Sequence, residues 1–278
     1  MSASTIAVHE RHHRNRPRPD DLISTTRTAF AAADLQALLD GDAPAVRITD
    51  FLDPSTLAHV RTSFVGRTDH GPLATDARFR RIGHAFSETT DADDRERYFA
   101  DAIANLNALR ARAAPHLYPA DAIRLLLDDV WPTGSTLLRH DGRPFFAGVA
   151  RYQQGGVDLE PHTDNISRNL PPELGLDVSR QLSVNVYLDV PDAGGELEIW
   201  DEYPDEDDYR GRIGDRTYGV DRATVGDPRW VVRPKPGEAI FIDPRRIHAV
   251  APSQDRPRIT IGLFIGLVSA DSPLVVWS

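Results

Sequence analysis

The sequence predicts a mainly β protein, a sandwich or jelly roll supported by helices from the first half of the chain. Two observations lead to this fold class. Before Trp131, apolar residues recur at the spacing of amphipathic helices. After Pro132, short apolar segments alternate with Gly, Pro and Asp turns, as in domains built from many short strands. We therefore divide the chain into a helical support region over 21–135 and a β core over 136–268.

The composition is that of a globular protein and limits its class. The chain has 278 residues, 40% hydrophobic and 8% aromatic, enough for a full core. Its net charge of −10 argues against a nucleic-acid-binding protein, and no apolar run is long enough for a membrane span. The N-terminus lacks the apolar core of a signal peptide and cysteine is absent. We therefore expect a cytoplasmic protein without disulfides or thiolate metal sites.

Helices dominate the expected structure of the first half. Residues 1–20 are polar, basic and rich in proline, so we expect a disordered tail there. Asp53 and Pro54 form a helix start, with the acid as N-cap and the proline in the first turn. Residues 66–90 are polar and irregular. The other elements expected before residue 135 are helices over Thr25–Leu39, Asp91–Ala114 and Pro119–Val130 and a short strand over Ala45–Phe51.

The clearest of these helices is Asp91–Ala114. Phe99, Ile103, Leu106 and Leu109 recur at helical spacing, so we expect them to form one buried face. A helix with one such face packs against a core, and here the core is the predicted sheet.

The β core contains the remaining elements. An acidic, turn-rich stretch, 201–228, interrupts the strands; it is either a solvated loop or a lid over a pocket, because long loops in compact domains are often lids. Residues 269–278 are expected to be a C-terminal tail. The predicted strands are Ser135–Arg139, Phe145–Gln153, Gln181–Val190, Glu196–Trp200, Trp230–Arg233, Ala239–Asp243 and Arg258–Leu267.

A histidine and a carboxylate two positions apart, His162 and Asp164, are the first candidate metal ligands. On an extended strand, residues i and i+2 point to the same side. His248, in the segment DPRRIHAV, is the candidate third ligand. Two histidines and one carboxylate form the facial triad of non-haem Fe(II) oxygenases, whose opposite face stays open for substrate and O2.

Two further strands carry polar groups suited to an organic acid. In Gln181–Leu188 polar and apolar residues alternate strictly, and a polar face inside a sandwich requires water, partners or a ligand. Arg258 and Thr260 follow His248 and share one side of their strand. A guanidinium can bind a carboxylate through two hydrogen bonds, so Arg258 is a candidate carboxylate receptor.

These motifs together resemble the Fe(II)/2-oxoglutarate-dependent dioxygenases with the double-stranded β-helix (jelly-roll, cupin-like) fold. The prolyl-hydroxylase-like branch and the hydroxylases and halogenases of amino acids and natural products are the most similar groups. The matching signature is His162-x-Asp164, His248 and Arg258-x-Thr260. Supporting matches are Tyr152, Tyr187-Leu188, the segment GGEL at 194–197 and the segment PGE at 236–238.

The resemblance implies a site and a reaction. His162, Asp164 and His248 would bind Fe(II), and 2-oxoglutarate and O2 would be the cosubstrates. Hydroxylation of an unactivated C–H bond would then release succinate and CO2. Arg258 would bind the distal carboxylate of 2-oxoglutarate, helped by Tyr187 or Thr260. The candidates for its other end are Tyr152, Ser183 and Asn185.

One residue position distinguishes the hydroxylases from the halogenases of this family. Related halogenases carry Gly or Ala where the carboxylate ligand stands, and this leaves room for chloride. Asp164 occupies that position, so the resemblance implies hydroxylation, or another oxidation such as desaturation, over halogenation.

The sequence says less about the substrate than about the metal and the cosubstrate. We expect a small molecule, an amino acid or amino-acid derivative, and Asn165, Arg245 and Arg246 are the candidate substrate residues. A peptide or protein substrate stays open, as does a homodimer. The alternatives outside this class are a non-catalytic β-helix protein binding a carboxylate, a cupin-type metal enzyme without 2-oxoglutarate and a zinc hydrolase. The presence of all three ligands disfavours the first, Arg258 disfavours the second and the order of the motif disfavours the third.

Overall fold

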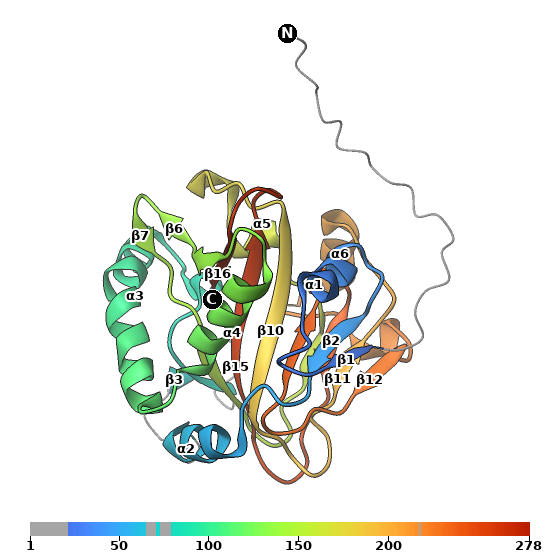
Figure 1. Cartoon of the computed structure of the whole chain (residues 1–278). Helices are drawn as coiled ribbons and strands as arrows, with labels where there is room; N and C mark the ends of the chain where they lie inside the picture. The colour runs from blue at the N-terminus through green and yellow to red at the C-terminus, as the bar shows by residue number, and fades with distance from the viewer. Residues whose placement is uncertain (1–21, 65–70, 73–78, 217) are drawn as a thin grey trace.

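Two β-sheets packed face to face form the centre of the molecule (Figure 1). The computed structural model describes residues 22–64, 71–72, 79–216 and 218–278, so the expected tail over 1–20 lies outside the described residues. The larger sheet has ten strands in the order β1-β2-β13-β10-β15-β8-β4-β3, and β16 joins β15 to β5. These strands are β1 (Ile23–Thr25), β2 (Ala45–Ile48), β3 (Gly71–Pro72), β4 (Phe79–Ile82), β5 (Ser135–Leu137), β8 (Val149–Gln153), β10 (Arg180–Asp189), β13 (Ala239–Ile242), β15 (Arg258–Leu267) and β16 (Leu274–Trp277).

The smaller sheet has four strands in the order β12-β11-β14-β9, all antiparallel. Apolar side chains of both sheets, among them Tyr187, Ile199 and Trp230, pack into one cluster between them. This arrangement confirms the expected mainly β, jelly-roll architecture with helical support. The strands of this sheet are β9 (Leu159–His162), β11 (Leu197–Ile199), β12 (Trp230–Val232) and β14 (His248–Val250), and a separate hairpin pairs β6 (Arg139–His140) with β7 (Arg143–Pro144).

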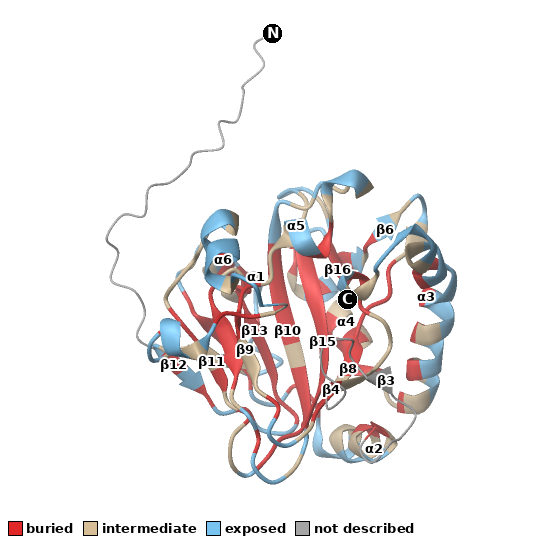
Figure 2. Ribbon diagram, turned by 180° about the vertical axis from the view of Figure 1, so that it is seen from behind, coloured by how far each residue is buried: buried red, intermediate tan, exposed pale blue. Residues whose placement is uncertain are grey.

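Helices cover the outer face of the larger sheet. Figure 2, seen from behind, shows β10 and β15 buried and the outward surface of α3 exposed. Alternate residues of β10, Leu182 to Leu188, pack in one large core with α1, α2, α3 and α4. The helices are α1 (Ala32–Leu39), α2 (Pro54–Phe64), α3 (Ala92–Ala113), α4 (Pro119–Val130), α5 (Ile166–Asn169) and α6 (Glu206–Ile213), with 3-10 turns at η1 (Phe86–Glu88), η2 (Pro172–Leu174) and η3 (Arg222–Thr224).

Local sequence explains the helix bounds. Asp53 accepts hydrogen bonds from the backbone N–H groups of Ser55 and Thr56, and so begins α2 as an N-cap. Asp91 caps α3 in the same way, and Pro119 begins α4. In α3, Phe99, Leu106 and Leu109 are buried as expected, but Ile103 is 42% exposed. The buried face is completed by Tyr98, Ala102 and Ala113.

Three segments differ from the sequence-based expectation. Ile23–Thr25 forms a strand parallel to β2, and α1 begins only at Ala32. Phe79–Ile82, within the stretch expected to be irregular, pairs with β8. Leu274–Trp277, within the expected C-terminal tail, is a buried strand, because its Leu-Val-Val-Trp run suits the edge of the core beside β15. None of the described helices has the length and apolar character needed to cross a membrane.

Candidate metal centre and active site

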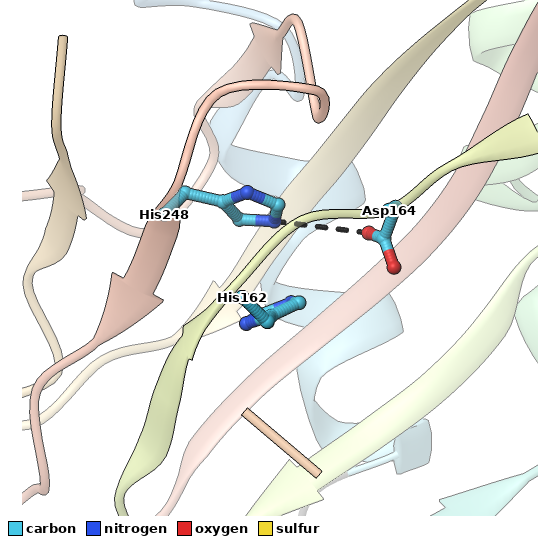
Figure 3. Close-up of side chains that lie close together, drawn as sticks. All are labelled: His162, Asp164 and His248. Carbon is cyan, nitrogen blue, oxygen red and sulfur yellow. Dashed lines mark ion pairs between the residues drawn. The ribbon is translucent and has the colours of Figure 1, made fainter. Parts of the chain in front are cut away.

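The three predicted metal ligands meet at one edge of the smaller sheet (Figure 3). His162 ends β9, and His248 begins β14 as its direct cross-strand partner. Asp164 lies two residues beyond His162, where its backbone N–H donates to Pro244 O at 2.8 Å. One ligand atom from each residue lies within 4.8 Å of the others, and His248 Nε2 is 3.7 Å from Asp164 Oδ2. The structure therefore brings together a donor set that was dispersed in the sequence.

The backbone orients both imidazole rings. His162 Nδ1 lies 2.7 Å from the carbonyl oxygen of Glu160, and His248 Nδ1 lies 2.9 Å from that of Arg246. A carbonyl accepts from a protonated Nδ1, which leaves each Nε2 lone pair free for a metal. Burial, with a smaller contribution from the neighbouring His248 and against the opposing effect of Asp164, lowers the pKa of His162 to about 3. His162 is therefore neutral at pH 7, the form that binds metal.

Two imidazole nitrogens and one carboxylate oxygen suit Fe(II), which accepts mixed nitrogen and oxygen ligands. Two histidines and one carboxylate are also the ligands of the facial triad of non-haem iron oxygenases. The residues therefore fit an iron centre with positions left for other ligands.

The second predicted group, Arg258 with its neighbours, lies between the sheets. Arg258 is 5% exposed, and its Nη2 donates to Tyr187 Oη at 3.2 Å. The guanidinium carbon lies 4.9 Å from the centroid of the Tyr187 ring. Thr260, 1% exposed, is the cross-strand partner of Tyr187. Among the described residues, none accepts a hydrogen bond from the buried Nε of Arg258. A buried donor of this kind suits an incoming carboxylate.

The polar face of β10 also lies as expected. Its alternate residues Leu182 to Leu188 belong to the core beneath the helices, so Gln181, Ser183, Asn185 and Tyr187 point to the other side of the sheet. Gln181 and Ser183 are buried, and Asn185 is partly exposed.

Tyr152 is not brought to this group. It packs in the core on the helix side of the sheet, and its hydroxyl donates to Phe64 O at 2.6 Å. Its neighbour Arg151 points to the opposite side of β8 and was missed by the sequence reasoning. The signal was present, because alternation along β8 sends Arg151 inward if Tyr152 points outward.

The three candidate substrate residues have protein partners. Arg246, 3% exposed, forms an ion pair with Asp201 at 2.6 Å. Arg245 forms an ion pair with Asp243. Asn165 caps α5 by accepting from Ser167 N–H, and its Nδ2 donates to Glu206 at the start of α6.

The stretch 201–228, of which all but residue 217 is described, contacts β9 at the metal ligand His162. The ring of Tyr218 lies 5.0 Å from that of His162, and Val220 N–H donates to Pro161 O at 2.7 Å. Arg168 lies over the ring of Tyr209 at 4.3 Å. Apolar residues of the stretch, among them Val220 and Tyr209, form a small core with strands of the smaller sheet. The segment is thus joined to the site by several contacts.

Comparisons with known proteins agree with this geometry. A family model described as the 2OG-Fe(II) oxygenase superfamily matches residues 147–266, a range that contains the triad and Arg258. Residues 147–266 therefore belong to the 2OG-Fe(II) oxygenase superfamily. The chain is 28% identical to the L-isoleucine 3(1)-dioxygenase of Pantoea ananatis over 150 residues, 50% of this chain. The match spans 48% of that protein, about half its length.

Solved structures show the same fold. An N-substituted L-amino acid dioxygenase from Burkholderia ambifaria, in complex with α-KG, superposes with a TM-score of 0.61 and 18% identity, covering 89% of this oxygenase and 91% of that chain. HygX from Streptomyces hygroscopicus, with nickel and 2-oxoglutarate bound, superposes with a TM-score of 0.50 and 13% identity, covering 86% and 87%.

Proposed function

We propose that this oxygenase is an Fe(II)- and 2-oxoglutarate-dependent dioxygenase that hydroxylates an unactivated C–H bond of a small molecule, an amino acid or amino-acid derivative. The observation that carries the proposal is the combination of two sites inside one sandwich. A His-Asp-His donor set lies at one edge, and a buried arginine with an unused donor lies on the facing sheet.

The chain's own residues have separate roles in this proposal. His162, Asp164 and His248 hold Fe(II), and the carbonyl oxygens behind the two imidazoles fix the ring orientations. Arg258 binds one carboxylate of 2-oxoglutarate, with Tyr187 and Thr260 beside it. When bound, iron, 2-oxoglutarate and O2 supply the oxidising power that breaks a C–H bond, with release of succinate and CO2. His162 and His248 are buried, which limits the access of water to them.

The substrate class is supported by two observations. Two of the similar proteins are dioxygenases of L-isoleucine and of N-substituted L-amino acids. In this chain, Tyr218 contacts His162 and Val220 contacts Pro161, and such close cover beside a metal ligand supports a small substrate over a folded protein. We include in the proposal that this segment acts as a lid. The absence of cysteine also leads us to propose a cytoplasmic location.

The test is an anaerobic titration of the metal-free protein with Fe(II) and then 2-oxoglutarate, followed by visible absorbance. O2 is then admitted with a panel of amino acids and N-acyl amino acids, and succinate and oxidised product are quantified. We expect substrate-triggered succinate in equal amounts with a hydroxylated product. Succinate with a chlorinated product in chloride buffer, or no 2-oxoglutarate binding at all, would contradict the proposal.

A further inference from the structure

Arg151 carries a positive charge that no described residue neutralises. Its Cα is the cross-strand partner of Thr260, so it lies on the interior side of the sheet next to Arg258. Burial is the largest effect on its guanidinium and lowers its pKa. Among the described residues, none forms a hydrogen bond or an ion pair with it.

The two carboxylates that influence Arg151 most are committed elsewhere. Glu88 forms an ion pair with Arg81, and Asp164 belongs to the metal triad. Arg151 is only partly exposed, and a charge withdrawn from water without a counter-ion costs stability that is recovered when an anion binds. Arg151 therefore lacks a counter-ion in the folded chain alone, and a bound anionic ligand would supply one.

A second polar group and a glycine complete the arrangement. A Cβ atom on Gly262 would lie 2.5 Å from Nη1 of Arg151 and 2.6 Å from Oδ1 of Asn185. The two side chains therefore converge over Gly262, on the strand between their own strands β8 and β10. Any larger residue at 262 would displace one of them. Asn185 also has no hydrogen-bond partner among the described residues.

We propose that Arg151 and Asn185 form the receptor for the carboxylate of the amino-acid substrate. A guanidinium supplies charge and two parallel donors, and a carboxamide supplies a further donor. This proposal rests on the proposed function and deepens it, because it selects substrates with a free carboxylate.

The same chemistry could serve either the substrate or 2-oxoglutarate, and the structure favours the substrate. Arg258 already offers an unused donor for one carboxylate of 2-oxoglutarate, and the metal triad is proposed to hold the other end. Arg151 is coupled electrostatically to Asp164 and to Tyr218, which lie at the metal, and is repelled by Arg258. Two neighbouring cations fit two separate anions, and the second anion is then the substrate.

The experiment measures binding without turnover. The Fe(II) and 2-oxoglutarate complex is prepared anaerobically, and the panel of L-amino acids and N-acetyl-L-amino acids is titrated by calorimetry. The tightest ligand is then compared with its own carboxamide. In the wild-type protein we expect the carboxamide to bind at least about 30-fold more weakly, the factor that corresponds to about 2 kcal/mol for an unpaired buried charge.

Variants test whether Arg151 causes the preference for the acid over its carboxamide. In Arg151→Gln we expect acid and carboxamide to bind with similar affinity, while the Kd for 2-oxoglutarate changes less than about threefold. Arg151→Lys keeps the charge without the paired donors and should retain part of the preference. Arg180→Gln removes an exposed arginine at the start of β10 and should change none of these values.

Each other outcome overturns either this proposal or the proposed function. A large loss of 2-oxoglutarate affinity in Arg151→Gln, with the acid preference kept, would assign Arg151 to the cosubstrate. Equal binding of acid and carboxamide by the wild-type protein, or no binding from the panel, would remove the carboxylate receptor, even if both variants failed to fold. Arg151-dependent binding without oxidised product after O2 is admitted would instead overturn the proposed function alone.

Discussion

His162 and His248 are direct cross-strand partners on β9 and β14, and their ring centroids lie 4.2 Å apart. Opposite residues on antiparallel strands have neighbouring side chains, so pairing alone brings the two imidazoles to one point. The register changes immediately after this pair, between His248 and Val250. The sheet thus positions two of the three ligands, and Asp164 joins them from the residues just past β9.

Replacement of Asp164 by glycine should abolish hydroxylation while leaving the fold intact. Asp164 is partly exposed and supplies the one carboxylate of the triad, so its loss removes a metal ligand without opening a cavity in the core. We expect product formation at background level and weaker Fe(II) binding, measured by anaerobic titration, with an unchanged melting temperature of the metal-free protein. Full activity in Asp164→Gly would remove this residue from the ligand set.

Replacement of Arg258 by glutamine should weaken 2-oxoglutarate binding by about 2–5 kcal/mol, which is roughly 30-fold or more in Kd. The guanidinium is buried and its Nε has no described partner, so no water can substitute for it easily. Tyr187→Phe removes only the hydroxyl that accepts from Arg258 and should cost about 1 kcal/mol. Anaerobic calorimetry measures both. Equal Kd values for wild type and Arg258→Gln would contradict the cosubstrate role.

Side-chain periodicity predicted much of the site. The i and i+2 spacing of His162 and Asp164, and the alternation along β10, survive in the structure because strands impose a period of two. The partners of Arg245 and Arg246 could not be predicted. Asp201 lies far from Arg246 in the sequence, and only the folded chain shows that it is the counter-ion.

In the fold, too, local signals were predictable and long-range contacts were not. Pro119–Val130 was bounded correctly because its proline start and apolar stripe are local signals. β9 and β14 are short, and their pairing depends on segments far away in the chain. Ile103 has the helical spacing of a core residue yet is exposed, because the position of the sheet decides which side of α3 is covered.

The buried ion pair between Arg246 and Asp201 should contribute to stability and not to substrate choice. Arg246→Met removes this hydrogen-bonded ion pair but leaves Asp201 with Arg229 at 3.5 Å, so we expect a cost of about 1.5–3 kcal/mol. At ~2 °C or more per kcal/mol, the melting temperature should fall by roughly 3 °C or more. Arg212→Met, which removes a surface pair with Glu202, should cost less than about 1 kcal/mol. A changed acid preference in folded Arg246→Met would restore its substrate role.

His84 should make the protein less stable as the pH falls. Burial lowers the pKa of His84 from its ordinary value of 6.5, and the charge of Arg81 lowers it further. The unfolded chain therefore binds a proton more readily than the folded chain, so this contribution is present above pH 6.5 and is lost as the pH falls. Denaturant midpoints at pH 7 and pH 5 measure the loss. His84→Gln should show a smaller change, and an identical change in both proteins would exclude His84 as a cause.

Tyr218 should keep cosubstrate consumption coupled to substrate oxidation. Its ring packs 5.0 Å from that of His162 and belongs to the segment proposed as a lid. Tyr218→Ala removes this cover and admits water, so we expect more succinate than hydroxylated product. Tyr218→Phe is the matched control; it keeps the ring and lacks only a hydroxyl that no described residue bonds, so its ratio should stay near that of wild type. The succinate-to-product ratio is measured by mass spectrometry. A wild-type ratio in Tyr218→Ala would show that this ring does not close the site, because loss of a lid contact must expose the triad that it covers.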